Sequence, residues 1–170
     1  LGFLDIKIDR EGNIIVTGRR ISVGNDYGNL QATVAKISHI DGSVLWCKRA
    51  TIPNNAYSSG ISLAIGANNQ IYWMGTTTDR PEQNTYTGLF FMELDTNGNV
   101  VWQNTLGGSQ SDTDAWYGSG HRELALSPDG TKLATTGYGY RGPTDSSTDY
   151  RHMITAQLPA DGTRGEAYVT

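Results

Sequence analysis

Cysteine and positive charge are both scarce in this chain, and each shortage excludes a class of protein. Among 170 residues there is one cysteine, Cys47, so no internal disulfide can form. The 13 Lys and Arg residues form no run and are outnumbered by 17 Asp and Glu residues, for a net charge of −4. A nucleic-acid partner requires a basic patch that neutralises phosphates, so we expect no nucleic-acid binding.

Targeting and glycosylation signals are missing as well. The sequence has no Asn-x-Ser/Thr site, so neither glycans nor disulfides indicate a compartment. Residues 1–6 already alternate as a strand does, with no basic segment, apolar segment or initiating Met before them. We therefore expect a chain that begins within its fold and does not insert into a membrane.

Glycine and tyrosine, by contrast, are plentiful. The chain has 21 Gly and 9 Tyr residues, while only 18% of its residues are charged. This composition favours strands and turns over helices, so the first prediction is an all-β fold.

Two sequence patterns repeat along the chain, which changes how every motif is interpreted. A turn followed by an apolar strand ends at Gly18, Gly75 and Gly137, with spacings of 57 and 62 residues. An Asp/Asn-Gly turn comes four residues before Trp46 and Trp102, which are 56 residues apart. The third copy of this second pattern, Asp-Gly-Thr at 161–163, lacks the Trp.

Each repeat is expected to hold four short strands, because turn residues interrupt the apolar alternation at regular intervals. The alternation of Leu4, Ile6 and Ile8 indicates that one face of each sheet is apolar. The expected strands are at about residues 3–9, 14–20, 32–39, 44–50, 61–66, 70–76, 88–94, 100–106, 123–127, 132–138, 152–158 and 165–170.

Four antiparallel strands in a repeat of roughly 40–60 residues are typical of a β-propeller blade. We predict three blades, at residues 1–60, 61–122 and 123–170. A β-sandwich and a stack of three-sheet repeats are the alternatives, although a sandwich gives no reason for both patterns to recur with nearly one period. Because a propeller closes with four blades or more, other blades or subunits are expected to complete this one.

Particular segments resemble a known family. Residues 127–133, Ser-Pro-Asp-Gly-Thr-Lys-Leu, are similar to the turn between the first two strands of many bacterial propeller repeats. Residues 98–108 resemble the last strand and exit of the bacterial β-propeller repeat family, which occurs in surface-exposed proteins and in bacteriophage structural proteins. The resemblance implies a structural protein of a virion (tail, nozzle or fibre) or of the bacterial cell surface, and a virion or extracellular location.

The two ends of the predicted blades differ in loop length, which suggests a working face. Tight Gly or Asn turns join strands at one end, whereas the connections near 21–31, 51–60, 77–87, 107–122 and 139–151 are longer than a hairpin needs. Exposed Tyr, Trp and Arg anchor protein interfaces, and aromatic rings also stack on sugars. The candidate rim for a protein or glycan partner is Tyr27, Tyr57, Arg80, Tyr86, Trp116, Tyr117, His121, Tyr140 and Arg141. The alternative is that these aromatic residues pack back over the blade ends.

Metal and nucleophile chemistry find little support. The three histidines, His39, His121 and His152, are far apart and have no partner at ligand spacing, so no metal site is expected. Residues 95–99 place oxygens as a calcium loop does, but a hairpin turn explains them better. Residues 109–114, rich in Ser and Asp, could bind Ca²⁺, although such loops are usually only solvated.

Catalytic signatures are weak too. Ser119 lacks the strand-to-helix elbow of a hydrolase nucleophile, and Cys47 follows Trp46 inside an expected strand, where a buried structural thiol is ordinary. The pattern Asp95-x-x-Gly98-x-x-x-Trp102 resembles the tryptophan-docking repeat of pyrroloquinoline-quinone dehydrogenases, in which the Trp packs between blades. We therefore expect a non-enzymatic structural and recognition module without a cofactor; the alternative is part of a quinoprotein dehydrogenase propeller.

Overall fold

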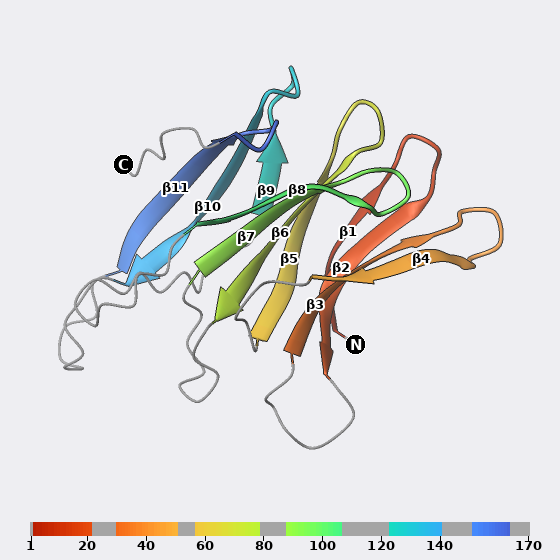
Figure 1. The fold of residues 1–170 in the computed structure, drawn as a ribbon, viewed down its shortest axis with the longest axis horizontal. Coiled ribbons are helices and arrows are strands. Elements are labelled where there is room, and N and C mark those ends of the chain that lie inside the picture. The colour runs from red at the N-terminus through yellow and green to blue at the C-terminus, as the bar shows by residue number, and fades with distance from the viewer. Residues whose placement is uncertain are drawn as a thin grey trace.

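The structure, a computed structural model, describes residues 2–21, 30–50, 57–78, 88–106, 123–140 and 151–163. These residues form eleven β-strands in three antiparallel sheets, and no helix occurs among them (Figure 1). A membrane-spanning helix is accordingly not found in these ranges. The predicted all-β class is confirmed.

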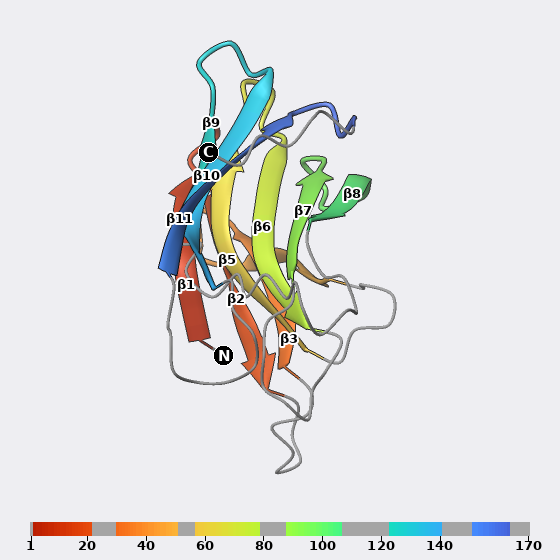
Figure 2. The ribbon, with the colours of Figure 1, turned by 90° about the vertical axis from the view of Figure 1, so that its left-hand side faces the viewer.

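Within each sheet, every strand pairs with its neighbour in the sequence (Figure 2). The first sheet holds β1 (Gly2–Ile8), β2 (Ile14–Ile21), β3 (Leu30–Ile37) and β4 (Val44–Arg49). The second holds β5 (Tyr57–Ile65), β6 (Ile71–Thr78), β7 (Gly88–Leu94) and β8 (Val100–Leu106). The third holds β9 (Glu123–Leu126), β10 (Lys132–Tyr140) and β11 (Arg151–Pro159). Eleven of the expected strands are therefore present, and the twelfth, at 165–170, lies outside the described residues.

Four of the expected loops, at 21–31, 51–60, 77–87 and 139–151, include strand ends, and two of these overlaps involve predicted rim residues. β5 starts at Tyr57, where Tyr57 pairs with Thr78 and Ser59 with Thr76. β10 continues to Tyr140, which pairs with Arg151 of β11. Tyr57 and Tyr140 are thus strand-end residues, not loop residues. Apolar alternation could not reveal these extensions because Ser58, Ser59 and Gly60 make up most of the first, and the second is only Gly139 and Tyr140.

The repeated glycines Gly18 and Gly75 are required by a bulge that recurs in two sheets. The register shifts between Phe3 and Asp5 in the first sheet and between Gly60 and Ser62 in the second. A Cβ on Gly18 would lie 1.9 Å from the carbonyl oxygen of Gly2, and one on Gly75 would lie 2.2 Å from that of Ser59. Only glycine therefore lets the second strand pass the bulge.

Gly137, the third member of this glycine series, lies in β10. It pairs with Ile154 of β11.

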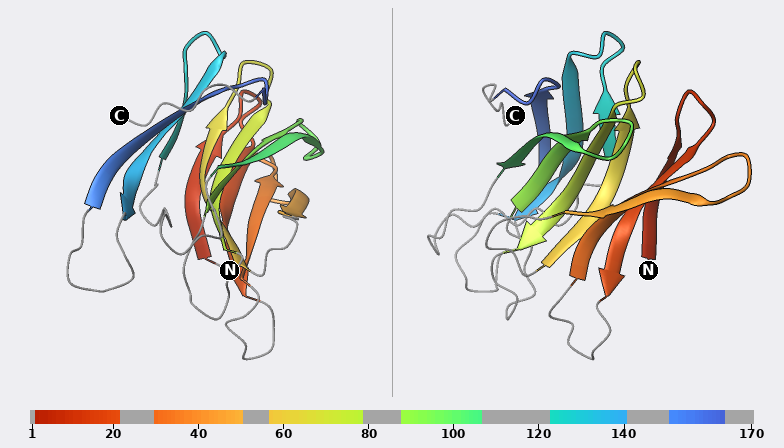
Figure 3. Two further views of the ribbon diagram at one scale, coloured as in Figure 1. Left: turned by 60° about the vertical axis from the view of Figure 1, so that its left-hand side comes forward. Right: turned by 45° about the vertical axis from the view of Figure 1, so that its right-hand side comes forward.

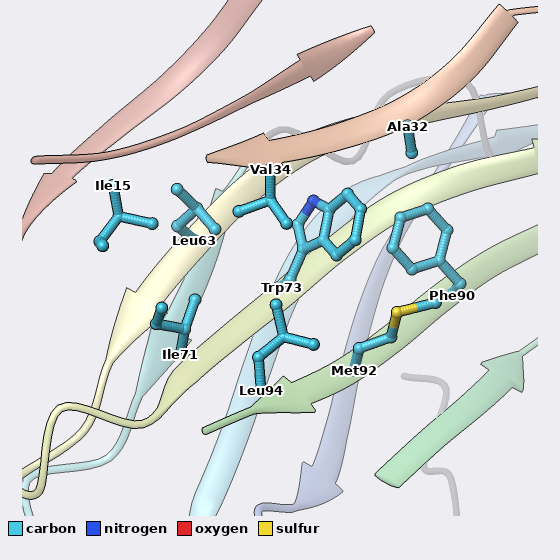
Figure 4. Close-up of a cluster of buried hydrophobic side chains, with 9 residues drawn as sticks. All are labelled: Ile15, Ala32, Val34, Leu63, Ile71, Trp73, Phe90, Met92 and Leu94. Carbon is cyan, nitrogen blue, oxygen red and sulfur yellow. The ribbon is translucent and has the colours of Figure 1, made fainter. Parts of the chain in front are cut away.

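The sheets stack face to face, with the second between the first and the third (Figure 3). Trp73, Phe90 and Met92 of the second sheet face Val34 and Ala32 of the first (Figure 4). Trp73 and Phe90 meet edge to face, with ring centroids 5.1 Å apart, an arrangement aromatic pairs favour.

The other face of the second sheet supplies a second apolar cluster. There Tyr72, Met74 and Phe91 pack with Leu124 and Leu133 of the third sheet. The second sheet is consequently covered on both faces.

A buried ion pair joins the first turn to the third strand. The Lys36 ammonium lies 2.9 Å from the Asp9 carboxylate, and the two side chains are 6% and 1% exposed. Asp9 also accepts hydrogen bonds from the backbone N–H groups of Glu11 and Asn13. Burial acts to raise the pKa of Asp9, but the hydrogen bonds from Lys36 and Asn13 outweigh it, so this pKa lies below its ordinary value.

Replacing Asp9 with Asn should destabilise the fold by about 3 kcal/mol at neutral pH, because it leaves the buried Lys36 ammonium with only the exposed Glu11 carboxylate, 3.8 Å away, as a partner. Because the pKa of Asp9 is lower in the folded state, the carboxylate stabilises the fold above the unfolded-state pKa of 3.8, and this contribution disappears as the pH falls through the folded-state value. Urea unfolding of the Asp9→Asn variant and the unchanged chain should therefore converge in acid.

Asp95→Asn is the matched control. Asp95 accepts the same pair of backbone bonds, from Asn97 and Asn99, but its turn is exposed. Replacing Asp95 should therefore lower the free energy of unfolding much less than replacing Asp9. An equal loss at both positions would mean that the turn bonds, not the ion pair with Lys36, account for the effect.

Candidate functional site

Most of the predicted rim lies outside the described residues. This applies to Tyr27, Arg80, Tyr86, Trp116, Tyr117, His121 and Arg141, and to the candidate calcium loop at 109–114. Tyr57 and Tyr140 are placed by their backbones alone, at the start of β5 and the end of β10. Within the ranges that the structure covers, no three His, Cys, Asp or Glu side chains are grouped as a metal site would require.

The strand ends nevertheless sort into two sides. The tight turns between β1 and β2, β5 and β6, and β9 and β10 lie together, and the strand ends that lead to residues 22–29, 79–87 and 141–150 lie at the opposite side (Figure 1). The strands thus direct these three longer connections to one side of the molecule.

Most of the tight turns combine an Asp carboxylate with a left-handed glycine, whereas the turn between β5 and β6 has Asn69 at a φ of 61°. Asp95 accepts the backbone N–H groups of Asn97 and Asn99 at 2.9 and 2.8 Å, and Gly98 has a φ of 77°. The hydrogen bond that the Asn99 side-chain amide donates to Asp95, together with these backbone bonds, holds the pKa of Asp95 below its ordinary value. The prediction that residues 95–99 are a hairpin turn is confirmed.

The best-defined site among the described residues is the joint where one sheet meets the next. At the first joint, the Trp46 indole N–H donates to the carbonyl oxygen of Thr96, 3.1 Å away and 50 residues further along the chain. The indole ring also lies over Gly98, where a Cβ would come within 3.0 Å of it. Trp46 of the first sheet therefore docks on the turn between β7 and β8 of the second.

The second joint repeats this arrangement. The Trp102 indole N–H lies 3.2 Å from the carbonyl oxygen of Ala160 and 2.6 Å from a Glu93 carboxylate oxygen. Its ring covers Gly162, whose added Cβ would lie 2.5 Å away. Asn104 also donates to the carbonyl oxygen of Gly162, at 2.7 Å. Trp102 thus docks on the turn after β11 as Trp46 docks on the turn after β7.

Hydrogen bonds between the first strands of successive sheets complete each joint. An Asp5 carboxylate oxygen accepts the backbone N–H of Leu63 at 2.8 Å and the hydroxyl of Ser62 at 2.9 Å. The Ser62 hydroxyl in turn accepts the backbone N–H of Leu124 at 3.0 Å. Asp5 and Ser62 are equivalent positions in their repeats, so the same bond is made twice.

Sequence reasoning found the tryptophans and the glycines but missed Asp5 and Ser62. These two residues differ in charge and size, and they share only a side-chain oxygen at one register position. Aligning the repeats on Gly18 and Gly75 gives the signal that was available, because Asp5 and Ser62 are then 57 residues apart, as the glycines are.

Comparison with known proteins does not extend this picture. No protein-family model matches the chain, and no curated protein matches it.

Replacing each turn glycine with Ala should measure what the tryptophan contact contributes. Gly42, Gly98 and Gly162 all have φ between 73° and 78°, so each change costs about 1–2 kcal/mol of backbone strain. Gly42 has no atom within 4 Å of its added Cβ, whereas at Gly98 and Gly162 the Cβ would push against an indole.

The expected order of destabilisation is Gly162→Ala, then Gly98→Ala, then Gly42→Ala. The first two should exceed the third by about 1–3 kcal/mol, the usual cost of overpacking. Thermal unfolding of the three variants provides the measurement. Equal losses would contradict a role for the indole in joining the sheets.

Proposed function

We propose that this chain is a non-enzymatic structural and recognition module with β-propeller architecture. It would serve a bacteriophage virion, as part of a tail, nozzle or fibre, or a bacterial surface protein. In this proposal, other blades complete the propeller, and the long-loop rim contacts a protein or a glycan.

The observation that carries the proposal is the recurrence of one joint between successive sheets. β5 lies against β1 of the preceding sheet and against β9 of the following one, so the three first strands are neighbours. The tryptophan contacts are made from the fourth strands, β4 and β8. A contact that relates each sheet to the next in one way is what radial repetition of blades requires, and a β-sandwich has no need of it.

The recognition role is supported by the division between strand ends. On the side with tight turns, Asp9 and Asp129 accept backbone N–H groups, and Gly12, Asn69 and Gly130 hold left-handed conformations, so few of these residues are free to vary. The strands that flank residues 22–29, 79–87 and 141–150 end on the other side, and in this proposal the connection at 107–122, which carries Trp116 and Tyr117, leaves from there too. Long loops on a rigid scaffold are the usual place for binding residues.

The quinoprotein alternative gains nothing from the tryptophan motif. Trp46 and Trp102 are occupied in contacts between sheets, and those contacts account for the Gly-x-x-x-Trp spacing without a cofactor. The motif is therefore explained by packing between sheets, whether the chain is a structural module or part of a quinoprotein.

Replacing Trp116 and Tyr117 together with Ala tests the rim. The amine-labelled chain should bind cells within a panel of bacteria, measured by flow cytometry, and the double variant should lose that binding with its melting temperature nearly unchanged. Protease treatment of the cells removes a protein partner, and periodate oxidation removes a glycan, so the two treatments identify the class.

The matched control is Arg10→Ala with Lys132→Ala, two exposed residues at the tight-turn side. This pair should leave binding intact. Binding that survives in the Trp116/Tyr117 variant, or a large fall in its melting temperature, would refute the rim as a contact surface.

A further inference from the structure

The first sheet leaves an apolar face uncovered. Leu4, Ile6 and Ile8 of β1 are 55%, 60% and 66% exposed. The equivalent residue of Ile6 in the second sheet, Leu63, is fully buried against the first sheet, and that in the third, Leu124, is 4% exposed against the second. The outer face of the first sheet therefore matches two faces that are covered elsewhere in the chain.

The turn between β3 and β4 is also shaped for a tryptophan. Gly42 has a φ of 73°, as Gly98 and Gly162 have 77° and 78°, but no atom lies within 4 Å of its added Cβ. At the other two turns an indole fills this place. Ile40, which corresponds to Thr96 and so would present its carbonyl to the indole N–H, is the most exposed large apolar residue among those described, at 84%.

The backbone N–H of Ile6 is the third part of the same joint. Its equivalents, at Leu63 and Leu124, each donate to a side-chain oxygen of the preceding sheet. At Ile6 the N–H donates instead to its own neighbour Asp5, at 2.8 Å on the exposed surface. All three elements of the joint are thus present on this face, each without the partner that its equivalents have.

The side chains on this face are small, so the element that covers it must supply large side chains. Val16, Thr33 and Ala35 stand where the second sheet has Trp73, Phe90 and Met92. They line an apolar hollow of about 160 Å³ together with Ile37, Cys47 and other residues of the first sheet. In the third sheet, the equivalents of Ile14 and Val16 are Leu133 and Thr135, and the cluster that covers this region includes the large Tyr72, Met74 and Phe91.

We propose that the outer face of the first sheet docks a further sheet of this repeat, in the same polypeptide. That sheet carries a tryptophan on its fourth strand that covers Gly42, a side-chain oxygen on its first strand that accepts the Ile6 N–H, and large apolar side chains that fill the hollow. The inference rests on the proposed function because both require blades beyond the three described.

A second copy of this chain fits the face poorly. In a head-to-tail arrangement the third repeat of a second copy would meet this face, and in the sequence of that repeat Glu166 follows Gly162 by four residues, as Trp46 and Trp102 follow Gly42 and Gly98. A carboxylate cannot make the indole contact on Gly42. The second sheet has all the required features, namely Trp102, the Ser62 hydroxyl and the large residues Tyr72, Met74 and Phe91.

The expectation of a buried thiol at Cys47 is wrong, because Cys47 is exposed on the outer face of the first sheet. Cys47 reports directly on this face, because it is the single cysteine of the chain and lines the hollow. The experiment compares the 170-residue chain with a tandem chain in which a copy of residues 57–118 precedes residue 1. This junction places Asp5 after the added β8 at the spacing that separates Glu123 from the native β8. The rate of Cys47 modification by a thiol reagent is measured in both.

Cys47 should react quickly in the 170-residue chain at every protein concentration. In the tandem chain its rate of modification should be lower by about tenfold or more, because docking covers the thiol. Replacing Trp102 with Ala in the added copy alone should restore most of the rate. Gly42→Ala should become more destabilising in the tandem chain than in the parent, since an indole now covers Gly42.

An added copy that does not fold, or that folds while Cys47 stays reactive, overturns the proposal. Protection of Cys47 that rises with concentration in the 170-residue chain also overturns it, because a second copy is then the occupant. These outcomes are independent of the Trp116/Tyr117 experiment, which neither uses Cys47 nor alters the first sheet. Failure of docking and failure of rim recognition are therefore distinguishable.

Discussion

The fold depends on the way an indole from one sheet rests on a glycine turn of the next. The contact combines a neutral hydrogen bond to a backbone carbonyl with a large apolar area, and it is made far along the chain from its origin, as in the 50 residues between Trp46 and Thr96. Each sheet alone has two faces to cover. Because the same contact recurs, the second sheet is covered on both sides, and the arrangement can be extended without new chemistry.

Much of this could be predicted from the sequence. The apolar alternation and the Asp-Gly or Asn-Gly turns were sufficient to locate eleven strands, because a strand of period two and a left-handed turn residue are both local properties. The spacing of Gly18 and Gly75 likewise reflected a local requirement, the close backbone approach at a bulge. The strand extension at Tyr57 escaped prediction because Ser and Thr pair across the strands there, and the extension at Tyr140 escaped it because Gly139 and Tyr140 pair with His152 and Arg151, so neither shows an apolar alternation.

The sequence predicted only part of the joint between successive sheets. The sequence showed that Trp46 and Trp102 recur, but not that the turn glycine following each of them by about one repeat is where its ring comes to lie, since that relation is made through space. The role of Asp5 was hidden for the same reason. Its partner is a backbone N–H, and a backbone N–H leaves no trace in the identity of residue 63.

The buried pair of Asp9 and Lys36 has a consequence for how such a chain can change over generations. Repeats with similar backbones invite unequal recombination, which deletes one unit in frame. Glu93 is the residue of the second repeat at the position of Lys36. A crossover that joined the turn of Asp9 to β7 would set two carboxylates against each other in a buried place, where both cannot remain charged without cost. The opposite charges of Lys36 and Glu93 thus make the first two repeats unequal in chemistry while they stay alike in shape, and a crossover between these two positions would reduce the stability of its product.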